Sequence, residues 1–318
     1  MTEIEAYRGR RVLILGGTGF IGRRVARLLT EAGADLHLVA RNPASAARLW
    51  DRLGVRGETV EADLARAGAG EEVVRSVRPS ITFNLAGYGV DPREQDESMA
   101  DRLNHGLVVE LVRAGEALQD ANWSGQHLVH AGSAAEYGAA GGRLGEDTLP
   151  APSGMYGKSK LAGTETIARA ARLGELRAVS ARLFTVYGPG ERAGRLFPSL
   201  LEAARTGTEL PLTTGTQRRD FTYVDDVAGG LLRLGVLPTA SIGTVNLASG
   251  TLESVRGFAE RAAAVLAIPA ERLRFGALPG RPDEMLHDAV TVERLRELTG
   301  WLPETSIEEG VLRTLATG

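Results

Sequence analysis

The stretch YGKSK, residues 156–160, contains both lysines of this 318-residue chain, in which every other position counted as Lys or Arg is arginine. On a helix, Tyr156 and Lys160 lie one turn apart on the same face, while Lys158 points away. A free tyrosine has a pKa of about 10, too high for proton transfer at neutral pH, and a cation one turn away lowers it. We therefore predict that Tyr156 is an acid/base residue activated by Lys160, and that Lys158 is solvated.

A serine upstream of this helix would complete the site. Ser133 lies in HAGSAAEYG, at the end of an expected strand, where its hydroxyl would orient a substrate carbonyl. The flexible ammonium of Lys160 would also reach the ribose hydroxyls of a nicotinamide, for which a rigid guanidinium is less suited. A Tyr-x-x-x-Lys spacing alone is a weak signal. Together with the serine and a glycine loop, it predicts the catalytic residues Ser133, Tyr156 and Lys160.

The glycine loop is GGTGFIG, residues 16–22, between an apolar run and an amphipathic segment. Gly16 would permit a tight turn, Gly19 would let a pyrophosphate approach the backbone, and Gly22 would allow close packing of helix on strand. A turn that serves packing only is the alternative. Its place between the first strand and the first helix favours a dinucleotide site.

The end of the second expected strand should select the dinucleotide. An acidic residue there binds the ribose of NAD, whereas arginine accommodates the 2′-phosphate of NADP. The sequence LVARN puts Arg41 at this point with Asn42 beside it, so NADP is favoured and NAD stays possible. A solvated loop arginine is the alternative for Arg41. Asp63, after the third strand, would accept a hydrogen bond from the adenine amino group. The predicted cofactor-binding residues are Gly16, Thr18, Gly19, Phe20, Ile21, Gly22, Arg41, Asn42, Asp63, Leu64, Leu85, Ala86, Gly87, Tyr156 and Lys160.

These residues need a scaffold of alternating strands and helices. Apolar runs such as RVLIL, DLHLVA and ITFNLAG alternate with helical segments, including one long helix from Glu94 to Leu118, which predicts an α/β fold with a parallel sheet covered by helices on both faces. Past Tyr187 this alternation loosens. Helices are expected there near residues 195–206, 225–236, 254–267, 291–298 and 306–316, in a smaller, mostly helical subdomain.

Composition excludes several classes of function. The net charge is −3 and gives no general attraction to nucleic acid or anionic membrane. The chain has no cysteine, so disulfides, thiolate nucleophiles and cysteine-bound metals are excluded. The histidines show no metal-ligand spacing, and no metal is predicted. The start is polar and no apolar run approaches the length of a membrane helix, so we expect a cytoplasmic protein.

An ordered series of motifs resembles the extended short-chain dehydrogenase/reductase family, whose members include nucleotide-sugar epimerases, dehydratases and reductases. Besides GGTGFIG, HAGSAAEYG and YGKSK, the series includes NLAG, ARLFTVYGPG, RRDFTYVDDVA, VNLASG and GWLPETSIEEG, and it runs nearly end to end. The resemblance implies a Rossmann doubly wound sheet, the Ser-Tyr-Lys site at Ser133, Tyr156 and Lys160, and a C-terminal subdomain that binds a nucleoside diphosphate sugar. The substrate-binding residues it implies are Thr185, Arg192, Arg195, Arg219 and Arg281.

The resemblance also implies boundaries and an assembly. Residues 1–185 and 219–248 would form the NADP-binding unit, and residues 186–218 and 249–318 the nucleotide-sugar subdomain. A homodimer would form through the helices near 94–118 and 155–174. The apolar positions Leu103, Leu107, Leu111 and Leu118 would either face the partner or pack on the protein's own sheet.

Departures from the family pattern narrow the reaction. Sugar 4,6-dehydratases usually carry acidic residues after the catalytic hydroxyl, where this chain has Ala134 and Ala135, which carry no proton. NAD-retaining 4-epimerases usually have an acidic residue where Arg41 stands. Thr185 replaces a frequent asparagine. Similarity of SAAEYG and RPDEM to reductases of 4-keto-6-deoxyhexoses predicts an NADPH-dependent ketoreductase. The alternatives are an NAD-dependent nucleotide-sugar epimerase and, in another class, a non-catalytic dinucleotide sensor that binds a protein partner.

Overall fold

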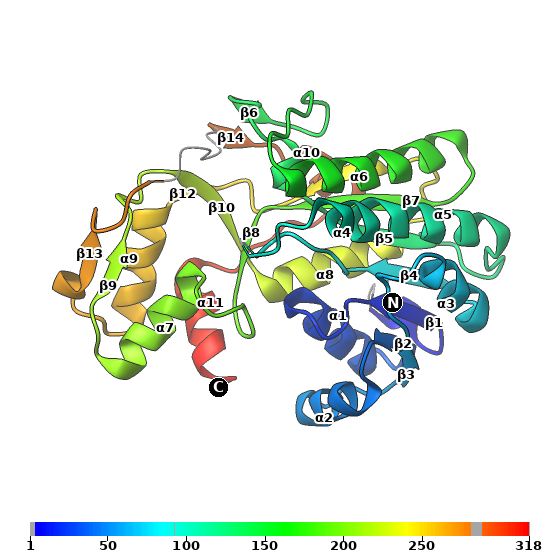
Figure 1. The fold of residues 1–318 in the computed structure, drawn as a ribbon, viewed down its shortest axis with the longest axis horizontal. Coiled ribbons are helices and arrows are strands. Elements are labelled where there is room, and N and C mark those ends of the chain that lie inside the picture. The colour runs from blue at the N-terminus through cyan, green and yellow to red at the C-terminus, as the bar shows by residue number, and fades with distance from the viewer. Residues whose placement is uncertain (1–3, 92, 281–287, 318) are drawn as a thin grey trace.

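The computed structural model of the protein describes residues 4–91, 93–280 and 288–317. At its centre is a seven-stranded parallel sheet with the strand order β11-β7-β5-β4-β1-β2-β3 (Figure 1). The order reverses between β1 and β4, where Leu15 lies beside Asn84, and parallel sheets bind ligands at the carboxyl ends of strands at such a point. The strands are β1 (Arg11–Leu15), β2 (Asp35–Ala40), β3 (Glu58–Glu61), β4 (Ile81–Asn84), β5 (Leu128–Ser133), β7 (Ala178–Leu183) and β11 (Gly243–Leu247).

Helices cover both faces of this sheet, because its strands are apolar on both sides. In β1, Val12 and Ile14 face one helical layer, while Leu13 and Leu15 face the other. The first layer contains α1 (Phe20–Glu31), α2 (Pro43–Leu53), α8 (Val224–Gly235) and α10 (Glu293–Thr299). The second contains α3 (Ala69–Val77), α5 (Leu107–Ala117) and α6 (Met155–Leu173).

The helix that leads into α5 contains a π-helical turn. α4 (Glu97–Asp101) continues through the π-helix η2 (Arg102–Gly106) into α5, so the single helix predicted from Glu94 to Leu118 is interrupted at its middle. Asn104 in this turn is fully buried and packs beside α6, where a Cβ on Gly163 would lie 2.2 Å from the Asn104 carbonyl oxygen. Such π turns occur often at functional sites.

A second core lies beyond β8 and is rich in aromatic side chains. Phe221 stacks on Phe258 with ring centroids 4.1 Å apart, and Tyr187 meets Phe258 edge-on at 5.0 Å. Its helices, at the left of Figure 1, are α7 (Leu196–Thr206), α9 (Val255–Val265) and α11 (Ile307–Leu315). The short strands outside the main sheet are β6 (Arg143–Leu144), β8 (Thr185–Tyr187), β9 (Leu210–Leu212), β10 (Arg218–Tyr223), β12 (Leu252–Ser254), β13 (Leu273–Phe275) and β14 (Ala289–Val290); the 3₁₀ turns are η1 (Glu5–Tyr7), η3 (Ala134–Glu136) and η4 (Ala270–Arg272).

Three acidic residues of RRDFTYVDDVA connect these parts of the chain. The fully buried Asp220 accepts hydrogen bonds from the N–H groups of Ser249 and Gly250 at 3.0 and 2.7 Å. Asp225 on α8 forms a two-pronged ion pair with Arg24 on α1. Asp226 accepts hydrogen bonds from the N–H and the hydroxyl of Thr305, both at 2.9 Å. All three carboxylates are therefore engaged in holding the fold.

The predicted doubly wound parallel sheet is confirmed, and the helices expected after Tyr187 are present within one or two residues. α2 was not predicted. β10 pairs with β8 and β12 rather than with the main sheet, although residues 219–248 were assigned to the NADP-binding unit; the division of the chain stays a prediction. Leu107 and Leu111 are buried against the protein's own sheet, with Leu103 and Leu118 packed beside them. Within the described ranges, none of the helices is long and apolar enough to traverse a bilayer.

Candidate active site

The glycine loop lies against the loop that follows β4. Gly16 has φ +76°, and a Cβ there would stand 2.6 Å from the backbone nitrogen of Ala86. A Cβ on Gly22 would stand 2.2 Å from the carbonyl oxygen of Gly16, so this turn excludes side chains at both positions. Gly19 is the N-cap of α1 and has no side chain to occupy the helix N-terminus. The result is an open backbone cradle that fits a dinucleotide pyrophosphate.

The end of β2 presents positive charge beside this cradle. Arg41 directly follows β2 and its side chain is exposed, as a residue that meets a 2′-phosphate would be. Asn42 instead caps α2, because its side-chain oxygen accepts the Ser45 N–H at 2.9 Å. Arg23 donates to the carbonyl of Thr18 in the glycine loop at 2.9 Å, and burial together with the nearby Arg52 lowers the Arg23 pKa.

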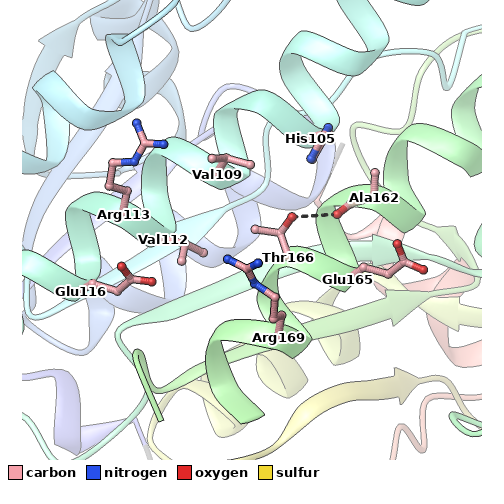
Figure 2. Close-up of a pocket in the computed structure, with 9 residues that line it drawn as sticks. All are labelled: His105, Val109, Val112, Arg113, Glu116, Ala162, Glu165, Thr166 and Arg169. Atoms are coloured by element: carbon pink, nitrogen blue, oxygen red, sulfur yellow. Dashed lines mark hydrogen bonds between the residues drawn. The ribbon is translucent and has the colours of Figure 1, made fainter. Parts of the chain in front are cut away.

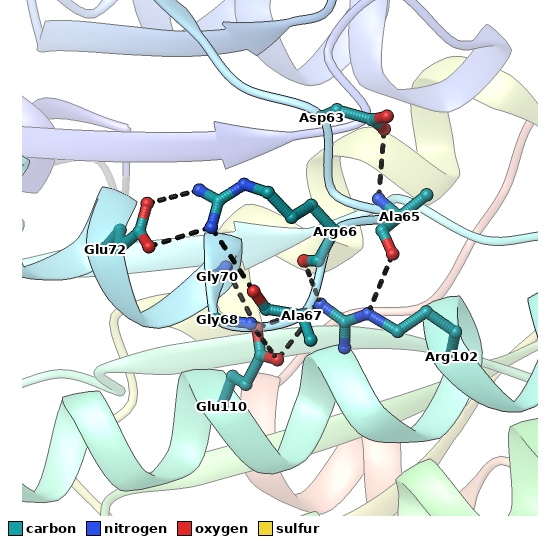
Figure 3. Close-up of polar contacts among 9 residues, drawn as sticks. All are labelled: Asp63, Ala65, Arg66, Ala67, Gly68, Gly70, Glu72, Arg102 and Glu110. Carbon is teal, nitrogen blue, oxygen red and sulfur yellow. Dashed lines mark hydrogen bonds and ion pairs between the residues drawn. The ribbon is translucent and has the colours of Figure 1, made fainter.

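The loop after β3 is held by α5 and the π turn (Figure 3). Glu110 accepts the N–H groups of Gly68 and Gly70 at 2.8 and 3.0 Å, and Arg102 donates to the carbonyls of Ala65 and Arg66 at 3.2 and 2.8 Å. Arg102 and Glu110 also pair with each other at 3.0 Å. This network fixes the loop that carries Asp63, whose exposed side chain accepts the N–H of Ala65 at 3.1 Å.

The three predicted catalytic residues converge on the same edge of the sheet. Ser133 is the last residue of β5, and its side chain lies close enough to Tyr156, in the first turn of α6, to lower the Tyr156 pKa. A Cβ on Gly87, in the loop after β4, would stand 3.8 Å from the Lys160 ammonium, and one on Gly89 would stand 3.2 Å from the Tyr156 ring. The loop after β4 therefore lies against the face of α6 that carries Tyr156 and Lys160, while Lys158 is exposed.

The electrostatics of Tyr156 differ from the prediction. The side chain is half-buried by area, but its hydroxyl is surrounded by protein, and burial raises the Tyr156 pKa to about 12. The hydrogen bond from Ser133 and the charge of Arg195 lower it, while Glu136 and Glu94 raise it. The expectation that Lys160 brings this pKa into the neutral range is therefore wrong for this structure, because removing water from the phenolate outweighs the favourable interactions.

Burial acts on Lys160 in the opposite direction. Its side chain is 3% exposed, and burial lowers its pKa to about 8, with Glu136 opposing the shift. His130 on β5 is completely buried beside it, and burial and the Lys160 charge lower the His130 pKa well below its usual value. Lys160 is thus protonated at neutral pH and titrates only slightly above it.

Two of the predicted substrate-binding arginines, Arg192 and Arg195, are paired with carboxylates. Arg192 pairs with Asp91, a buried residue in the loop after β4. Arg195 begins α7 and lies 3.5 Å from Glu191, whose pKa burial raises to about 7.

Arg219 lies on β10 and donates to the Arg218 carbonyl at 2.7 Å. Thr185 is on β8, half-buried, opposite Phe221. Arg281 lies outside the described residues.

Two residues near the site were not identified from the sequence. The Asn104 side chain accepts the Tyr88 N–H at 3.0 Å and donates to the Tyr88 carbonyl and the Ser159 hydroxyl at 2.8 and 2.9 Å, which ties the loop after β4 to α6. Glu136 accepts the Ser133 N–H at 2.7 Å. Its spacing from Ser133, S-x-x-E, is a capping-box pattern that was visible in the sequence. The described residues contain no cluster of three or more metal-binding side chains.

Lys160→Arg should reduce stability and nucleotide binding more than Lys158→Arg does. A guanidinium in the space of this buried ammonium would overpack the site, costing about 1–3 kcal/mol of unfolding free energy, and NADPH binding should fall at least tenfold. Lys158→Arg, at an exposed position, should match the parent within about 0.5 kcal/mol. Urea unfolding and nucleotide fluorescence titration would measure both. Equal behaviour of the two variants would mean that lysine at 160 has no special role.

Comparisons with known proteins agree with this geometry. Residues 12–247 match the model of the NAD dependent epimerase/dehydratase family. A dTDP-6-deoxy-L-talose 4-dehydrogenase (NAD(P)(+)) of Kitasatospora kifunensis is 32% identical over 95% of this chain and 93% of its own. A dTDP-L-rhamnose 4-epimerase of Burkholderia thailandensis is 26% identical over 98% of this chain and 96% of its own.

Solved structures show the same fold. The epimerase Mth375 of Methanothermobacter thermautotrophicus superposes with a TM-score of 0.84 at 24% identity, over 100% of this chain and 94% of that one. MoeE5, solved with UDP-glucuronic acid and NAD, has a TM-score of 0.78 at 26% identity, over 96% of this chain and 98% of that one. With a nucleotide cradle, a Ser-Tyr-Lys cluster and a family match over most of its length, this chain belongs to the NAD-dependent epimerase/dehydratase family, the extended short-chain dehydrogenases/reductases, and is an NAD(P)-dependent enzyme.

Proposed function

We propose that the protein is an NADPH-dependent reductase of a nucleoside diphosphate 4-keto-6-deoxyhexose. The observation that carries the proposal is the convergence of Ser133, Tyr156 and Lys160 beside the loop after β4: Ser133 lies close enough to Tyr156 to lower its pKa, and Lys160 is one turn further along α6. The relative from Kitasatospora kifunensis is named a 4-dehydrogenase of dTDP-6-deoxy-L-talose, and it is similar to this protein over 95% of the chain.

The residues support reduction in this way. NADPH would supply the hydride. Ser133 and Tyr156 would both donate hydrogen bonds to the ketone oxygen, and Tyr156 would give up its proton as that oxygen gains charge. Burial keeps Tyr156 protonated at neutral pH, since its pKa is raised to about 12, which suits a proton donor. Lys160 would hold the cofactor ribose. Ala134 and Ala135 offer no acid or base for dehydration.

An NAD-dependent nucleotide-sugar epimerase is the second candidate, because one relative of similar coverage is named a dTDP-L-rhamnose 4-epimerase. It would use the same three residues for oxidation followed by reduction. Substrate diphosphate would be met by arginines at the C-terminal side of the site, where it would compete with Asp91 for Arg192 and with Glu191 for Arg195. The two candidates differ in cofactor demand: a reductase consumes one NADPH for each product, and an epimerase consumes none.

A panel of TDP-, GDP-, CDP- and UDP-linked 4-keto-6-deoxy sugars, followed at the NADPH absorbance band, tests the reductase. We expect stoichiometric NADPH consumption with one member, and a loss of at least about 100-fold in kcat for Tyr156→Phe with NADPH affinity nearly unchanged. Conversion of a 4-hydroxy sugar nucleotide to its epimer without NADPH would instead establish the epimerase. Unchanged turnover in Tyr156→Phe would remove Tyr156 from the mechanism.

NADP preference is proposed on the exposed Arg41 at the end of β2. Arg41→Asp should weaken NADPH binding about 10- to 100-fold, because a charge-assisted hydrogen bond to the 2′-phosphate contributes roughly 1.5–3 kcal/mol. NADH binding should be unchanged or improved. Arg48→Asp makes the same charge change at an exposed position on α2 and should leave both affinities as they are. Equal loss in both variants would point to general electrostatics instead of a phosphate contact.

We also propose a homodimer through α5 and α6. A surface groove of about 530 Å³ lies between these helices (Figure 2). Val109, Val112 and Ala162 supply apolar lining, and each helix adds one cation and one carboxylate: Arg113 and Glu116 on α5, Arg169 and Glu165 on α6. A surface with both charges on both helices can pair with itself about a twofold axis.

Sedimentation should give twice the 33.7 kDa of one chain. Val109→Arg, in the groove, should give monomers, whereas Leu312→Arg, on the exposed side of α11, should not change the mass. A monomeric parent protein at micromolar concentration would contradict the dimer.

A further inference from the structure

Glu136 lies behind the catalytic residues and is completely buried. One carboxylate oxygen, Oε1, accepts the Ser133 N–H at 2.7 Å and the Thr164 hydroxyl at 3.0 Å. The other, Oε2, accepts the Nε–H of Arg182 at 2.7 Å. Ser133 ends β5, Thr164 is on α6 and Arg182 is on β7, so one carboxylate joins three elements of the site.

The surrounding residues leave space for this carboxylate. A Cβ on Gly132 would stand 2.9 Å from Oε1 of Glu136, so a side chain at position 132 would displace it. Thr164, which donates to Oε1, also shares a hydrogen bond of 2.7 Å with the buried Ser180 hydroxyl. Thr164 follows Lys160 by one helical turn, as Lys160 follows Tyr156. Glu136 therefore fixes the end of the serine-bearing strand against the helix face that carries the other two catalytic residues.

The negative charge of Glu136 also raises the pKa of Lys160, which lies on that helix. A buried ammonium is costly unless a negative charge lies near it, and a lysine withdrawn from water tends to lose its proton. The groups that affect Lys160 are Glu136 and the buried His130 beside it; those around Tyr156 are Ser133, Glu136, Arg195 and Glu94. Of these, Glu136 is the negative charge that acts on both catalytic groups.

We propose that Glu136 is a positioning residue of this active site: its carboxylate holds Ser133 against α6 and supplies a buried negative charge behind the helix face that carries Lys160. Arg182 secures the carboxylate in place, with its guanidinium over the Tyr137 ring at 4.5 Å. This role rests on the proposed use of Ser133, Tyr156 and Lys160 in catalysis, but not on the identity of the sugar.

Because the chain has two lysines, NMR of labelled lysine can follow the titration of Lys160 with little overlap from other signals. Protein labelled with ¹³C at lysine Cε contains two side-chain signals, from Lys158 and Lys160, and Lys158→Arg assigns them. In the parent protein the Lys160 signal should titrate near pH 8. Glu136→Gln keeps the acceptor for Ser133 but removes the charge that favours the ammonium, so the Lys160 midpoint should fall by roughly 0.5 or more on the pH scale. An unchanged midpoint in folded Glu136→Gln protein would overturn the proposal.

Asp226→Asn is the matched control. Its carboxylate also accepts one backbone N–H and one threonine hydroxyl, but from Thr305, and it should leave the Lys160 midpoint unchanged. If Glu136→Gln fails to fold because Arg182 loses its counter-charge, the double variant Glu136→Gln/Arg182→Gln removes both charges. Loss of the Arg182 cation alone would raise the Lys160 midpoint, so a fall in the double variant would still be due to Glu136.

Turnover gives a second readout that separates this proposal from the proposed function. With a sugar nucleotide that is converted, Glu136→Gln should lower kcat at least tenfold with little change in KM, and the fall of activity at high pH should begin at lower pH. Loss of kcat with no movement of the pH profile would contradict the electrostatic role. If no member of the panel is converted, the reductase proposal fails, while the lysine titration still decides the role of Glu136.

Discussion

The backbone of the glycine loop and the backbone of the loop after β4 are in van der Waals contact, and the active site depends on this contact. Gly16 has no room for a Cβ beside Leu85 and Ala86, and the same loop continues over Lys160 and Tyr156. Because β1 and β4 are neighbours at the reversal of strand order, their carboxyl ends meet although 69 residues separate Leu15 from Asn84 in the register. The loop after β4 therefore contacts the glycine loop and also the face of α6 that carries Tyr156 and Lys160.

Burial has opposite effects on the pKa values of Tyr156 and Lys160. Burial raises the pKa of Tyr156 and lowers that of Lys160, so both are driven toward their neutral forms. For a reductase, a neutral tyrosine is the form that can donate a proton. A neutral lysine would lose its charge–dipole contact with a ribose, and Glu136 opposes this loss. Its own burial is tolerable because Arg182 and two hydrogen-bond donors satisfy its oxygens.

Carboxylates also balance the arginines on the substrate side. Asp91 is buried and Glu191 is half-buried, and they pair with Arg192 and Arg195 respectively. One oxygen of Glu191 has no hydrogen-bond partner among the described residues, and its pKa is raised to about 7 by burial. A diphosphate entering here would compete with these carboxylates for guanidinium groups. The charge available to a substrate is therefore smaller than the number of arginines in the sequence suggests.

Much of the fold could be predicted from the sequence, because helices and strands follow local patterns of apolar residues. The alternating apolar runs predicted the sheet and its helical layers, and the positions of the glycine loop and of YGKSK predicted that both lie at the same edge of the sheet. α2 was missed although Ala46, Leu49, Trp50 and Leu53 follow the i, i+3, i+4, i+7 spacing of an amphipathic helix and Asn42 caps it. The π turn at Asn104 was missed because its partner, Tyr88, is brought to it only by tertiary packing. The S-x-x-E pattern at Ser133 was present in the sequence, but it does not indicate that the glutamate is buried.

The amino-acid sequence by itself determined which side chains are available for chemistry and on which elements they lie, because helix and strand periodicity depend on near neighbours. Only the tertiary structure decided their charge states. The spacing in the sequence shows a cation one helical turn from Tyr156, whereas the Tyr156 pKa depends mainly on how much water is removed from its hydroxyl. That amount is set by the packing around the side chain, to which residues remote in sequence contribute: Gly89, in the loop after β4, lies against the Tyr156 ring.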